Sequence, residues 1–246
     1  MYKESFLMAW ASLIANKMRS ILTMLGIIIG VAAVIALVSI GNGVKQDIQN
    51  SISSLGSNLL MVMPGAPRTP GVRPSAGSMK SLKVSDYEAI SKLDGVKAAS
   101  PMTNGSYVVI YQNKNWTTSV SGVSYNYLDV NNWSMKSGRF LSEKNVQNRE
   151  RVVVVGKTVV KNLFGDEDPV GAEIRVKNIP FRIIGVLNSK GSGAMGNDQD
   201  DMVIIPYTTA MERVEGVDYL RMIYVTGKDE NGIDRLQSDI ENLLRV

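Results

Sequence analysis

A long stretch without charge constrains this chain more than any other feature. No Asp, Glu, Lys or Arg occurs from Ser20 to Val44, and the run from Ile21 to Ile40 is almost wholly apolar. A helix of ~20 apolar residues spans a hydrocarbon layer about 30 Å thick. A cleaved signal peptide has an apolar region of only ~7–15 residues followed by a small-residue cleavage site, whereas a polar, helix-like run follows here. The sequence therefore predicts one transmembrane helix over residues 21–44.

The charges on either side of the span predict its orientation. Lys17 and Arg19 lie just before it and Lys3 lies further upstream, whereas Lys45 alone lies close behind it. Cytoplasmic flanks of membrane helices carry the excess of Lys and Arg. Lys17 and Arg19 are thus expected to lie at the membrane surface and to set the orientation of the span. The N-terminus faces the cytoplasm, and the chain beyond about residue 45 lies outside a cell (inner) membrane that it crosses once.

Residues 1–20 have the spacing of an amphipathic helix. Apolar residues recur every three or four positions, and Ser12, Asn16 and Arg19 fall between them. Such a helix suits the membrane surface, where lipid is its partner. A plain N-terminal extension of the spanning helix fits the same pattern, so both interpretations stay open. The recurring apolar residues are Phe6, Leu7, Trp10, Leu13, Ile14, Met18 and Ile21.

Two glycines inside the span form a small-xxx-small pair. Gly26 and Gly30 are four residues apart and therefore share one face of the helix. Small residues at this spacing let a second membrane helix approach closely. Gly26 and Gly30 are the predicted helix-packing residues. Because glycine is common in membrane helices, the alternative is that they make no specific contact.

Composition excludes several classes of function. The chain contains neither His nor Cys, which removes Ser-His and Cys-His catalytic arrangements, zinc sites and imidazole acid–base chemistry. The 27 Lys and Arg residues exceed the 23 Asp and Glu residues only slightly, and no basic run occurs. Nucleic acid is therefore not an expected partner.

The stretch RVVVVGKTVVKNLFG, residues 151–165, looks at first like a nucleotide-binding loop. That loop requires G-x-x-x-x-G-K-[ST], because the first glycine lets successive backbone amides face the phosphates. Arg151 stands where the first glycine belongs, and the predicted topology places the segment outside the cell, away from nucleoside triphosphate. We interpret Gly156 to Thr158 as a turn between a buried strand and a helix, and expect no cofactor in this chain.

Two acidic runs are candidates for a cation site. The run Asn197 to Asp201 offers clustered oxygen ligands, but it lacks the spacing of a calcium loop. The run Asp166 to Asp168 precedes Pro169, which is typical of a solvated turn. We interpret the first run as a polar turn before the strand that begins at Met202. The sequence thus predicts no catalytic, cofactor-binding or metal-binding residue.

Short strand and helix patterns alternate after the span and predict an α+β extracytoplasmic region of about 200 residues in two lobes. Helices are expected over Val44–Leu55, from a capping box at Ser85 and Glu88 to about Leu93, over Lys157–Phe164, after Pro206 and over Ile233–Leu244. Strands are expected over Asn58–Met63, Val96–Ala99, Tyr107–Tyr111, Trp116–Val123, Arg151–Val155, Ile174–Val176, Phe181–Leu187, Met202–Ile205 and Leu220–Val225. The Pro- and Gly-rich stretch from Pro64 predicts a loop.

Several stretches in a fixed order resemble one family. The run NKMRSILTMLGIIIGVAAVIALVSIGNG from Asn16 resembles the first membrane helix of MacB-like ABC transporter permeases, which are related to the FtsX-like permeases. Three later stretches resemble the extracytoplasmic part of the same family: VVVVGKTVVKNLFGDEDPVG from Val152, IPFRIIGVL from Ile179 and KGSGAMGNDQDDMVIIPYTTA from Lys190. The resemblance covers nearly the whole chain.

The resemblance implies a permease subunit of an ABC-type efflux or export system of the macrolide, peptide or lipoprotein class. It implies a homodimer that works with an ATPase on a separate domain or chain and with a periplasmic or extracellular adaptor protein. In such systems the motion driven by ATP passes from the cytoplasmic ATPase through the membrane helices to the extracytoplasmic domain. ATP would act on the partner, so this chain is not expected to be an enzyme.

The resemblance also divides the chain. Residues 45–112 and 218–246 would form a porter-like lobe, and residues 113–217 an inserted small α/β lobe of the kind called Sabre. These follow the surface helix 1–20 and the transmembrane helix 21–44. Family members have four membrane helices, which implies that this chain is a fragment lacking the last three.

Two rival functions remain on the sequence alone. The first is a stand-alone, single-span protein whose extracytoplasmic domain binds a ligand or a partner. The second is a membrane-anchored nucleotide hydrolase that depends on Lys157. Three further apolar spans encoded directly downstream would favour the transport subunit over the stand-alone protein.

Overall fold

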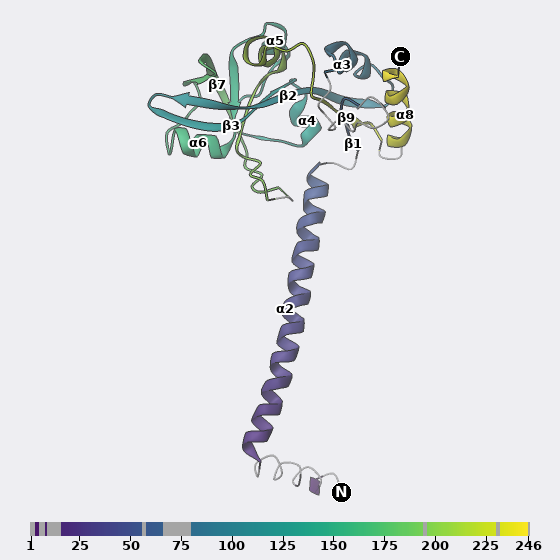
Figure 1. Ribbon diagram of the computed structural model, residues 1–246, viewed down its shortest axis with the longest axis vertical. Helices are drawn as coiled ribbons and strands as arrows, with labels where there is room; N and C mark the ends of the chain where they lie inside the picture. The colour runs from purple at the N-terminus through teal and green to yellow at the C-terminus, as the bar shows by residue number, and fades with distance from the viewer. Residues whose placement is uncertain are drawn as a thin grey trace, which may run out of the picture. The chain divides into compact units, whose positions relative to one another are not determined.

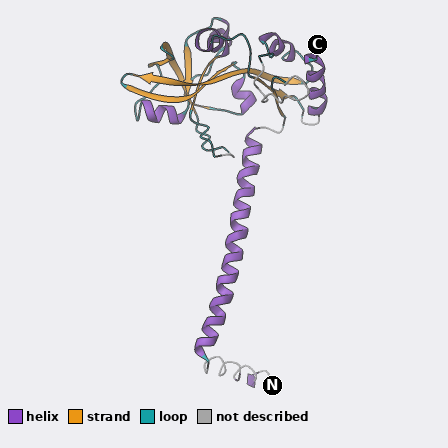
Figure 2. Cartoon of the chain, in the orientation of Figure 1, coloured by secondary structure: helices purple, strands orange, loops and turns teal. Residues whose placement is uncertain are grey.

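The computed structural model describes residues 3, 4, 8, 16–55, 58–65, 80–193, 196–229 and 232–245. Contacts between residues divide the chain into two units, residues 1–50 and residues 51–246. Figures 1 and 2 show the helices and strands. Most of the surface helix predicted over residues 1–20, and the Pro- and Gly-rich stretch after Gly65, lie outside the described residues.

One long helix, α2, runs without interruption from Lys17 to Leu55. Its part from Lys17 to Lys45 is a candidate membrane span by length and composition, and its described side chains are exposed. The helices predicted over 21–44 and Val44–Leu55 are therefore one element. Gly41 and Gly43 do not break it, because a glycine in a helix costs only about 1 kcal/mol relative to alanine.

The second unit begins with a small sheet that we call the open sheet. It consists of β1 (Leu59–Val62), β9 (Met222–Gly227) and the first part of β2 (Val96–Tyr111), in the order β1-β9-β2. Both outer strands run antiparallel to β9. Two helices, α3 (Val84–Ile90) and α8 (Ile233–Leu244), share a hydrophobic core with this sheet.

The core of the open sheet comes from the alternation of its strands and the stripe of its helices. Leu236 and Ile240 of α8 are buried, as their three- and four-residue spacing predicts. They pack in one cluster with Ile90 of α3 and with Ile223 and Val225 of β9. The predicted strand Leu220–Val225 thus exists, shifted by two residues toward the C-terminus.

The second part of β2 continues into a structure that we call the closed barrel. It pairs with β3 (Lys114–Val123), and the pairing passes in turn through β8 (Met202–Pro206), β5 (Val152–Val155), β7 (Ile179–Leu187) and β6 (Glu173–Val176). Strand β6 then pairs with β2, which closes the ring. Strand β4 (Met135–Gly138) adds to β7 outside the ring.

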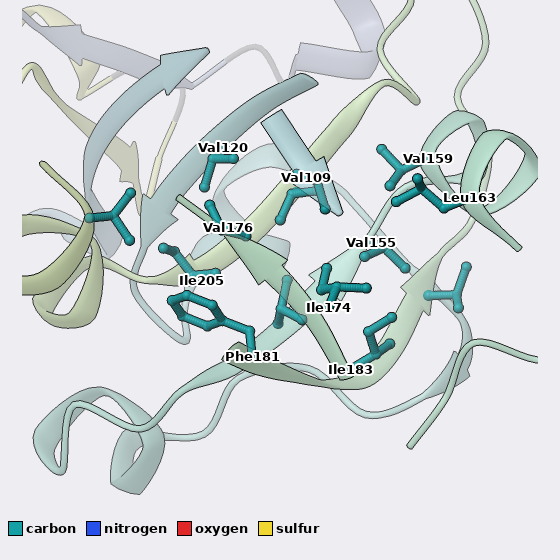
Figure 3. Close-up of a cluster of buried hydrophobic side chains, with 14 of the residues drawn as sticks. Val109, Val120, Val155, Val159, Leu163, Ile174, Val176, Phe181, Ile183 and Ile205 are labelled. Carbon is teal, nitrogen blue, oxygen red and sulfur yellow. The ribbon is translucent and has the colours of Figure 1, made fainter. Parts of the chain in front are cut away.

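Branched and aromatic side chains fill the closed barrel (Figure 3). Along β6, Ile174 and Val176 are buried while Glu173 and Arg175 are exposed, and β7 alternates in the same way around Phe181 and Ile183. This two-residue period places every second side chain in the core. Val109 and Val120 enter the same core from the β2–β3 hairpin.

Short helices connect the barrel strands in the chain. Helix α6 (Lys157–Leu163) follows β5 and packs Val159 and Leu163 on the barrel core. Helix α7 (Tyr207–Thr209) and the π-helix η1 (Ala210–Glu215) follow β8. Helices α4 (Tyr127–Asn131) and α5 (Glu143–Gln147) lie between β3 and β5 in the chain.

The structure corrects the two strands predicted over Val96–Ala99 and Tyr107–Tyr111. They are parts of the single strand β2. Pro101 and Gly105 lie between the two predicted segments and weaken the strand pattern there. At Met102 the strand changes partners, because that residue aligns with both Met222 of β9 and Val123 of β3.

The N-terminus of α3 also differs from the prediction. The helix begins at Val84, and the backbone N–H of Lys83 donates to the Asp86 carboxylate at 2.7 Å. Asp86 therefore reaches back to the cap, in place of the predicted Glu88. The cause is a shift of the helix start, which moves the third helical position from Glu88 to Asp86.

The predicted α+β class is confirmed at the level of a mixed α/β unit preceded by an apolar helix. The predicted lobe boundaries, 45–112, 113–217 and 218–246, divide the chain at the turn between β2 and β3. Strand β2 contributes to both the open sheet and the closed barrel. The division into porter-like and inserted lobes stays a prediction.

Candidate functional site

The Gly156 turn uses its own polar groups internally. The Gly156 N–H donates to the Met202 carbonyl at 2.9 Å, and the Thr158 N–H donates to the Asp200 carbonyl at 3.3 Å. The Thr158 hydroxyl donates to the Asp198 carboxylate at 2.6 Å. These groups of Gly156 and Thr158, which a phosphate loop would direct at a nucleotide, are therefore bonded to the first residue of β8 and to the segment before it.

A packing requirement accounts for the glycine at position 156. A Cβ atom there would overlap the Asp200 carbonyl oxygen, so only glycine lets the two backbone segments approach this closely. Gly156 is the N-cap of α6, and the four residues of β5 before it are all buried. The strand, turn and helix that the sequence predicts are present, and the glycine allows the close contact with the Asp200 backbone.

The carboxylates before β8 accept hydrogen bonds from the protein. Asp200 is buried and accepts from the Ser189 hydroxyl and from the Lys190 backbone N–H at 2.7 Å. Asp201 accepts from the Trp116 indole N–H at 2.8 Å. Asp198 accepts from the Asp200 N–H at 2.9 Å in addition to Thr158. These bonds fit the predicted polar turn, which joins β3, β7, β8 and α6.

The other predicted acidic run lies in solvent. Asp166, Glu167 and Asp168 are exposed, and Asp168 accepts from the Val170 N–H at 3.0 Å across Pro169. Among the residues that the structure describes, no group of three or more His, Cys, Asp or Glu side chains is arranged to hold a metal ion.

The side chain of Lys190 fixes the start of the loop between β7 and β8. Its ammonium donates to the Asn131 carbonyl at 2.7 Å and lies 4.6 Å from the centre of the Trp133 ring. Partial burial lowers the pKa of Lys190 below its ordinary value. The contacts suit a cation that holds this loop against α4.

Two pairs of tyrosines pack in different core clusters of the second unit. Tyr127 and Tyr224 lie in the cluster that includes residues of β5 and β8, and Tyr87 and Tyr207 lie in the core of the open sheet. Tyr127 and Tyr224 meet edge to face, with ring centres 6.2 Å apart, and Tyr87 meets Tyr207 in the same way at 6.0 Å. Burial raises the pKa of Tyr207 to about 12 and raises that of Tyr127 as well. The hydroxyls therefore stay protonated near neutral pH, and the rings serve packing.

One carboxylate is buried where the barrel meets η1. The Glu215 side chain is 4% exposed, accepts from the Thr103 hydroxyl and lies 3.9 Å from the Arg221 guanidinium. Glu215 comes from η1 and Thr103 from β2, so the contact ties the π-helix to the strand. No sequence pattern marks this pair, because the residues are far apart in the chain.

The predicted membrane residues lie on α2. Lys17 and Arg19 are exposed in its first turn, and Gly26 and Gly30 are exposed on the apolar span. A Cβ atom at either glycine would meet nothing within 4 Å, so the single chain has no packing need for glycine there. Whether these residues pack against a second helix stays a prediction.

Two hollows were missed by sequence reasoning. One, of about 540 Å³, has Arg139, Glu150 and Arg182 among its lining residues; Glu150 and Arg139 both bond to Asn145 of α5. The other, of about 530 Å³, lies between β1 and α8. Both form from segments distant in the chain, so only the sheet order shows them.

Comparison with known proteins gives a match over nearly the whole chain. Residues 20–243 match the model of a family described as MacB-like periplasmic core domain. A protein of Rhodospirillum rubrum, named macrolide export ATP-binding/permease protein MacB, is 44% identical over 247 residues, which covers all of this chain. A protein of the same name from Chlorobium luteolum is 38% identical over 96% of this chain. The chain spans 37% and 36% of these relatives, little more than a third of their length.

Solved structures agree with the sequence matches. The periplasmic region of MacB from Actinobacillus actinomycetemcomitans aligns with 79% of this chain and 86% of its own, with a TM-score of 0.68 and 28% identity. The extracellular domain of the ABC-type transporter YknZ from Gram-positive bacteria aligns with 76% of this chain at a TM-score of 0.64. At 18% identity, the second match shows a shared fold alone.

Proposed function

The chain belongs to the family of proteins with a MacB-like periplasmic core domain, and from that premise we propose that it works in a permease subunit of an ABC-type export system. The family match concerns the periplasmic core, so the ATP-dependent step belongs to a cytoplasmic ATPase on another domain or chain. We propose that the chain transmits motion from that ATPase to the extracytoplasmic region. The relatives' name suggests macrolides as one cargo class, beside peptides and lipoproteins.

One observation carries this proposal: α2 continues beyond the uncharged span. The helix passes Lys45, where the apolar segment ends, and stays helical to Leu55. At 1.5 Å per residue, a helix of this length exceeds a hydrocarbon layer about 30 Å thick. An unbroken helix resists bending and can carry a displacement from one side of a membrane to the other.

A proline inside α2 tests the transmission step. Lys45→Pro in the full-length protein removes a helix hydrogen bond and kinks the helix, at a cost of ~3 kcal/mol or more. We expect macrolide export by cells that carry the variant to fall at least about tenfold. The reason is that a small displacement of a coupled group can lower a rate by this much or more. The rate of ATP hydrolysis in the purified transporter should stay within about twofold of the wild-type rate, which also shows that the variant assembles.

Lys45→Ala is the matched control, because it removes the same charge and keeps the helix. Its export should equal that of the wild type. Wild-type export by Lys45→Pro, with the protein inserted and hydrolysing ATP, would contradict transmission through α2.

We also propose that two copies meet through the face of α2 that carries Gly26 and Gly30. Both glycines are exposed and have open space around them, so leucine fits each position in the single chain. Leucine in place of either glycine would keep two helices apart. Gly26→Leu and Gly30→Leu should therefore reduce crosslinking between the helices of two copies, whereas Ile28→Leu should leave it unchanged. Unchanged crosslinking in both glycine variants would rule out this packing.

The remaining parts of the proposal concern placement. The N-terminus would face the cytoplasm, with Lys17 and Arg19 at the inner surface, and residues 51–246 would lie outside. There the porter-like lobe would correspond to the open sheet and the inserted lobe to the closed barrel, and an adaptor protein would contact one or both. Lys17→Glu with Arg19→Glu should lower the fraction of correctly oriented protein, measured by protease access to the outer region.

A further inference from the structure

Two adjoining hollows lie on the outer side of β7. The first is the hollow of about 540 Å³ beside β4, and the second, of about 430 Å³, lies toward β6. They share three lining residues and therefore form one elongated depression, which we call the arginine groove. The arginines of the groove are Arg139, Arg149, Arg151 and Arg182, and its acidic residues are Glu150 and Glu173.

The alternation of β7 directs Arg182 into this groove. Ile183 points into the barrel core (Figure 3), so the preceding side chain points away from the core. Arg182 is exposed and aligns with Val152 of β5 on one side and with Glu173 of β6 on the other. It lines both hollows and therefore stands where they meet.

Close packing of two backbone segments places Arg139 at the wall of the first hollow. A Cβ atom at Gly138 would overlap the Ile184 carbonyl oxygen, and one at Gly185 would overlap the Arg139 carbonyl oxygen. The Arg139 N–H donates to the Ile184 carbonyl at 2.9 Å. Glycine at both positions lets the end of β4 lie this close to β7. The backbone therefore fixes where the Arg139 side chain starts.

A buried amide holds two of the charged side chains. Asn145 of α5 is 3% exposed. Its side-chain oxygen accepts from the Arg139 guanidinium at 3.1 Å, and its side-chain nitrogen donates to the Glu150 carboxylate at 2.6 Å. The Ser142 N–H and hydroxyl donate to the same oxygen, each at 2.9 Å. Such a network of buried polar groups holds its members in fixed positions.

The charges of the groove are not balanced within the protein. Arg149 pairs with Glu212 of η1 at 2.9 Å. Over the described part of the chain, Arg139, Arg151 and Arg182 form no ion pair, although Glu173 lies opposite Arg182 in the sheet. A guanidinium binds a carboxylate through two parallel hydrogen bonds. The groove therefore favours a ligand that carries acidic groups.

We propose that the arginine groove binds an acidic peptide segment of a partner protein. Three guanidiniums without an ion pair are spread over two hollows, whereas one small anion such as phosphate is saturated by one or two of them. An extended peptide advances about 3.3 Å per residue, so acidic residues two positions apart reach different arginines. Apolar surface from Val152, Val170 and Ile184 lies between the charges and suits the apolar side chains of a peptide. The inference goes beyond the proposed function, because it involves no step of export.

Peptide binding to residues 1–246 in detergent tests the proposal. The probe is a capped peptide of six residues in which glutamate and valine alternate, and the same peptide with glutamine in place of glutamate is the matched control. Calorimetric titration at low salt should give a Kd at least about tenfold lower for the acidic peptide, and added salt should weaken its binding. Equal binding of the two peptides, or no binding of either, would overturn the proposal.

Substitutions in the groove locate the binding. Arg182→Gln should raise the Kd of the acidic peptide at least about tenfold, because this arginine lines both hollows. Arg139→Gln and Arg151→Gln should each raise it less, since each arginine lines one hollow. Arg235→Gln is the control, because it removes the same charge from an exposed position of α8 outside the groove. An effect of Arg235→Gln as large as that of Arg182→Gln would show attraction by net charge alone and would overturn the proposal.

Glu173→Gln should act in the opposite direction. It removes a negative charge next to Arg182 and should lower the Kd of the acidic peptide by roughly two- to fivefold. All the substituted arginines and Glu173 are exposed, so unchanged melting midpoints should confirm that the variants fold. Inorganic phosphate is the remaining probe. Phosphate that binds as tightly as the acidic peptide would assign the groove to small anions and contradict the proposal.

Discussion

The closed barrel and the open sheet solve the same folding problem in different ways. In the barrel each strand of the ring has a partner on both sides, and its core is sealed between them. In the open sheet, β1 has one described partner and Met61 and Met63 remain half exposed. Closure removes unpaired edges, whereas an open edge must be covered or must bind something. Among the described strands, the ring of the barrel therefore leaves no strand without two partners, whereas the open sheet has an unpaired edge at β1.

The largest expected effect is in the barrel core. Phe181 is fully buried among the strands that close the ring (Figure 3). Phe181→Ala should lower the free energy of unfolding by about 3–5 kcal/mol, because it removes buried surface and leaves a cavity. Chemical denaturation of residues 1–246 in detergent measures the loss.

Val108→Ala is the control for that change. Val108 lies on β2 next to a core residue, yet its side chain is 47% exposed. Val108→Ala should lower the free energy of unfolding by less than about 0.5 kcal/mol, as other surface substitutions do. A decrease of under about 1 kcal/mol for Phe181→Ala would show that the barrel core is not tightly packed.

The open sheet should respond less to the same kind of change. Ile240 is buried, but it also lines the hollow beside β1. Ile240→Ala should lower the free energy of unfolding by about 2 kcal/mol, the low end of the range for such substitutions, because the hollow lets the site relax. Ser238→Ala, at an exposed position of α8 outside the hollow, is the control. A loss as large as that of Phe181→Ala would remove this difference between sheet and barrel.

The Gly156 turn gives an intermediate effect. Gly156→Ala forces a Cβ against the Asp200 carbonyl, so we expect a loss of about 1–3 kcal/mol. Lys157→Ala, one residue later on an exposed position, should change neither stability nor export. A large loss of export in Lys157→Ala with unchanged stability would restore the nucleotide-binding interpretation.

The smallest effect is expected at the surface of the open sheet. Lys83 bonds to Asp218 at 2.6 Å, and this hydrogen bond lowers the pKa of the Asp218 carboxyl below 3.8. A lowered carboxyl pKa adds stability above pH 3.8, and the contribution is lost as the pH falls through the lowered value. Asp218→Asn should therefore reduce the melting midpoint slightly at neutral pH. The difference should vanish in high salt and at pH 2, and persistence there would exclude a charge effect.

Sequence periodicity predicted the elements whose signals are local. Helix α8 has the predicted limits, Ile233–Leu244, because its apolar stripe and its flanking polar residues act within a few turns. The strand and turn around Gly156 were predicted for the same reason. Short helices such as α4 and α5 were not predicted, because five residues are too few to show a period.

The features that could not be predicted depend on pairing between segments that are far apart in the chain. The parallel pairing of β3 with β8 joins residues some eighty positions apart, and it closes the barrel together with β6. The hollow beside β1 likewise needs the sheet order β1-β9-β2, which no local pattern contains. The family resemblance predicted the class of protein because several motifs in order are specific where each alone is not.

We propose that ATP bound to a cytoplasmic ATPase moves the extracytoplasmic region through α2. The chain has no Cys, so Asn113→Cys on the exposed β2–β3 turn gives it one spin label. In a full-length transporter from which any other cysteines have been removed, pulsed electron resonance measures the distance between the labels of two copies. We expect ATP to shift this distance distribution, and Lys45→Pro to abolish the shift while ATP still binds. Identical distributions with and without ATP, in a transporter that hydrolyses ATP and exports, would contradict it.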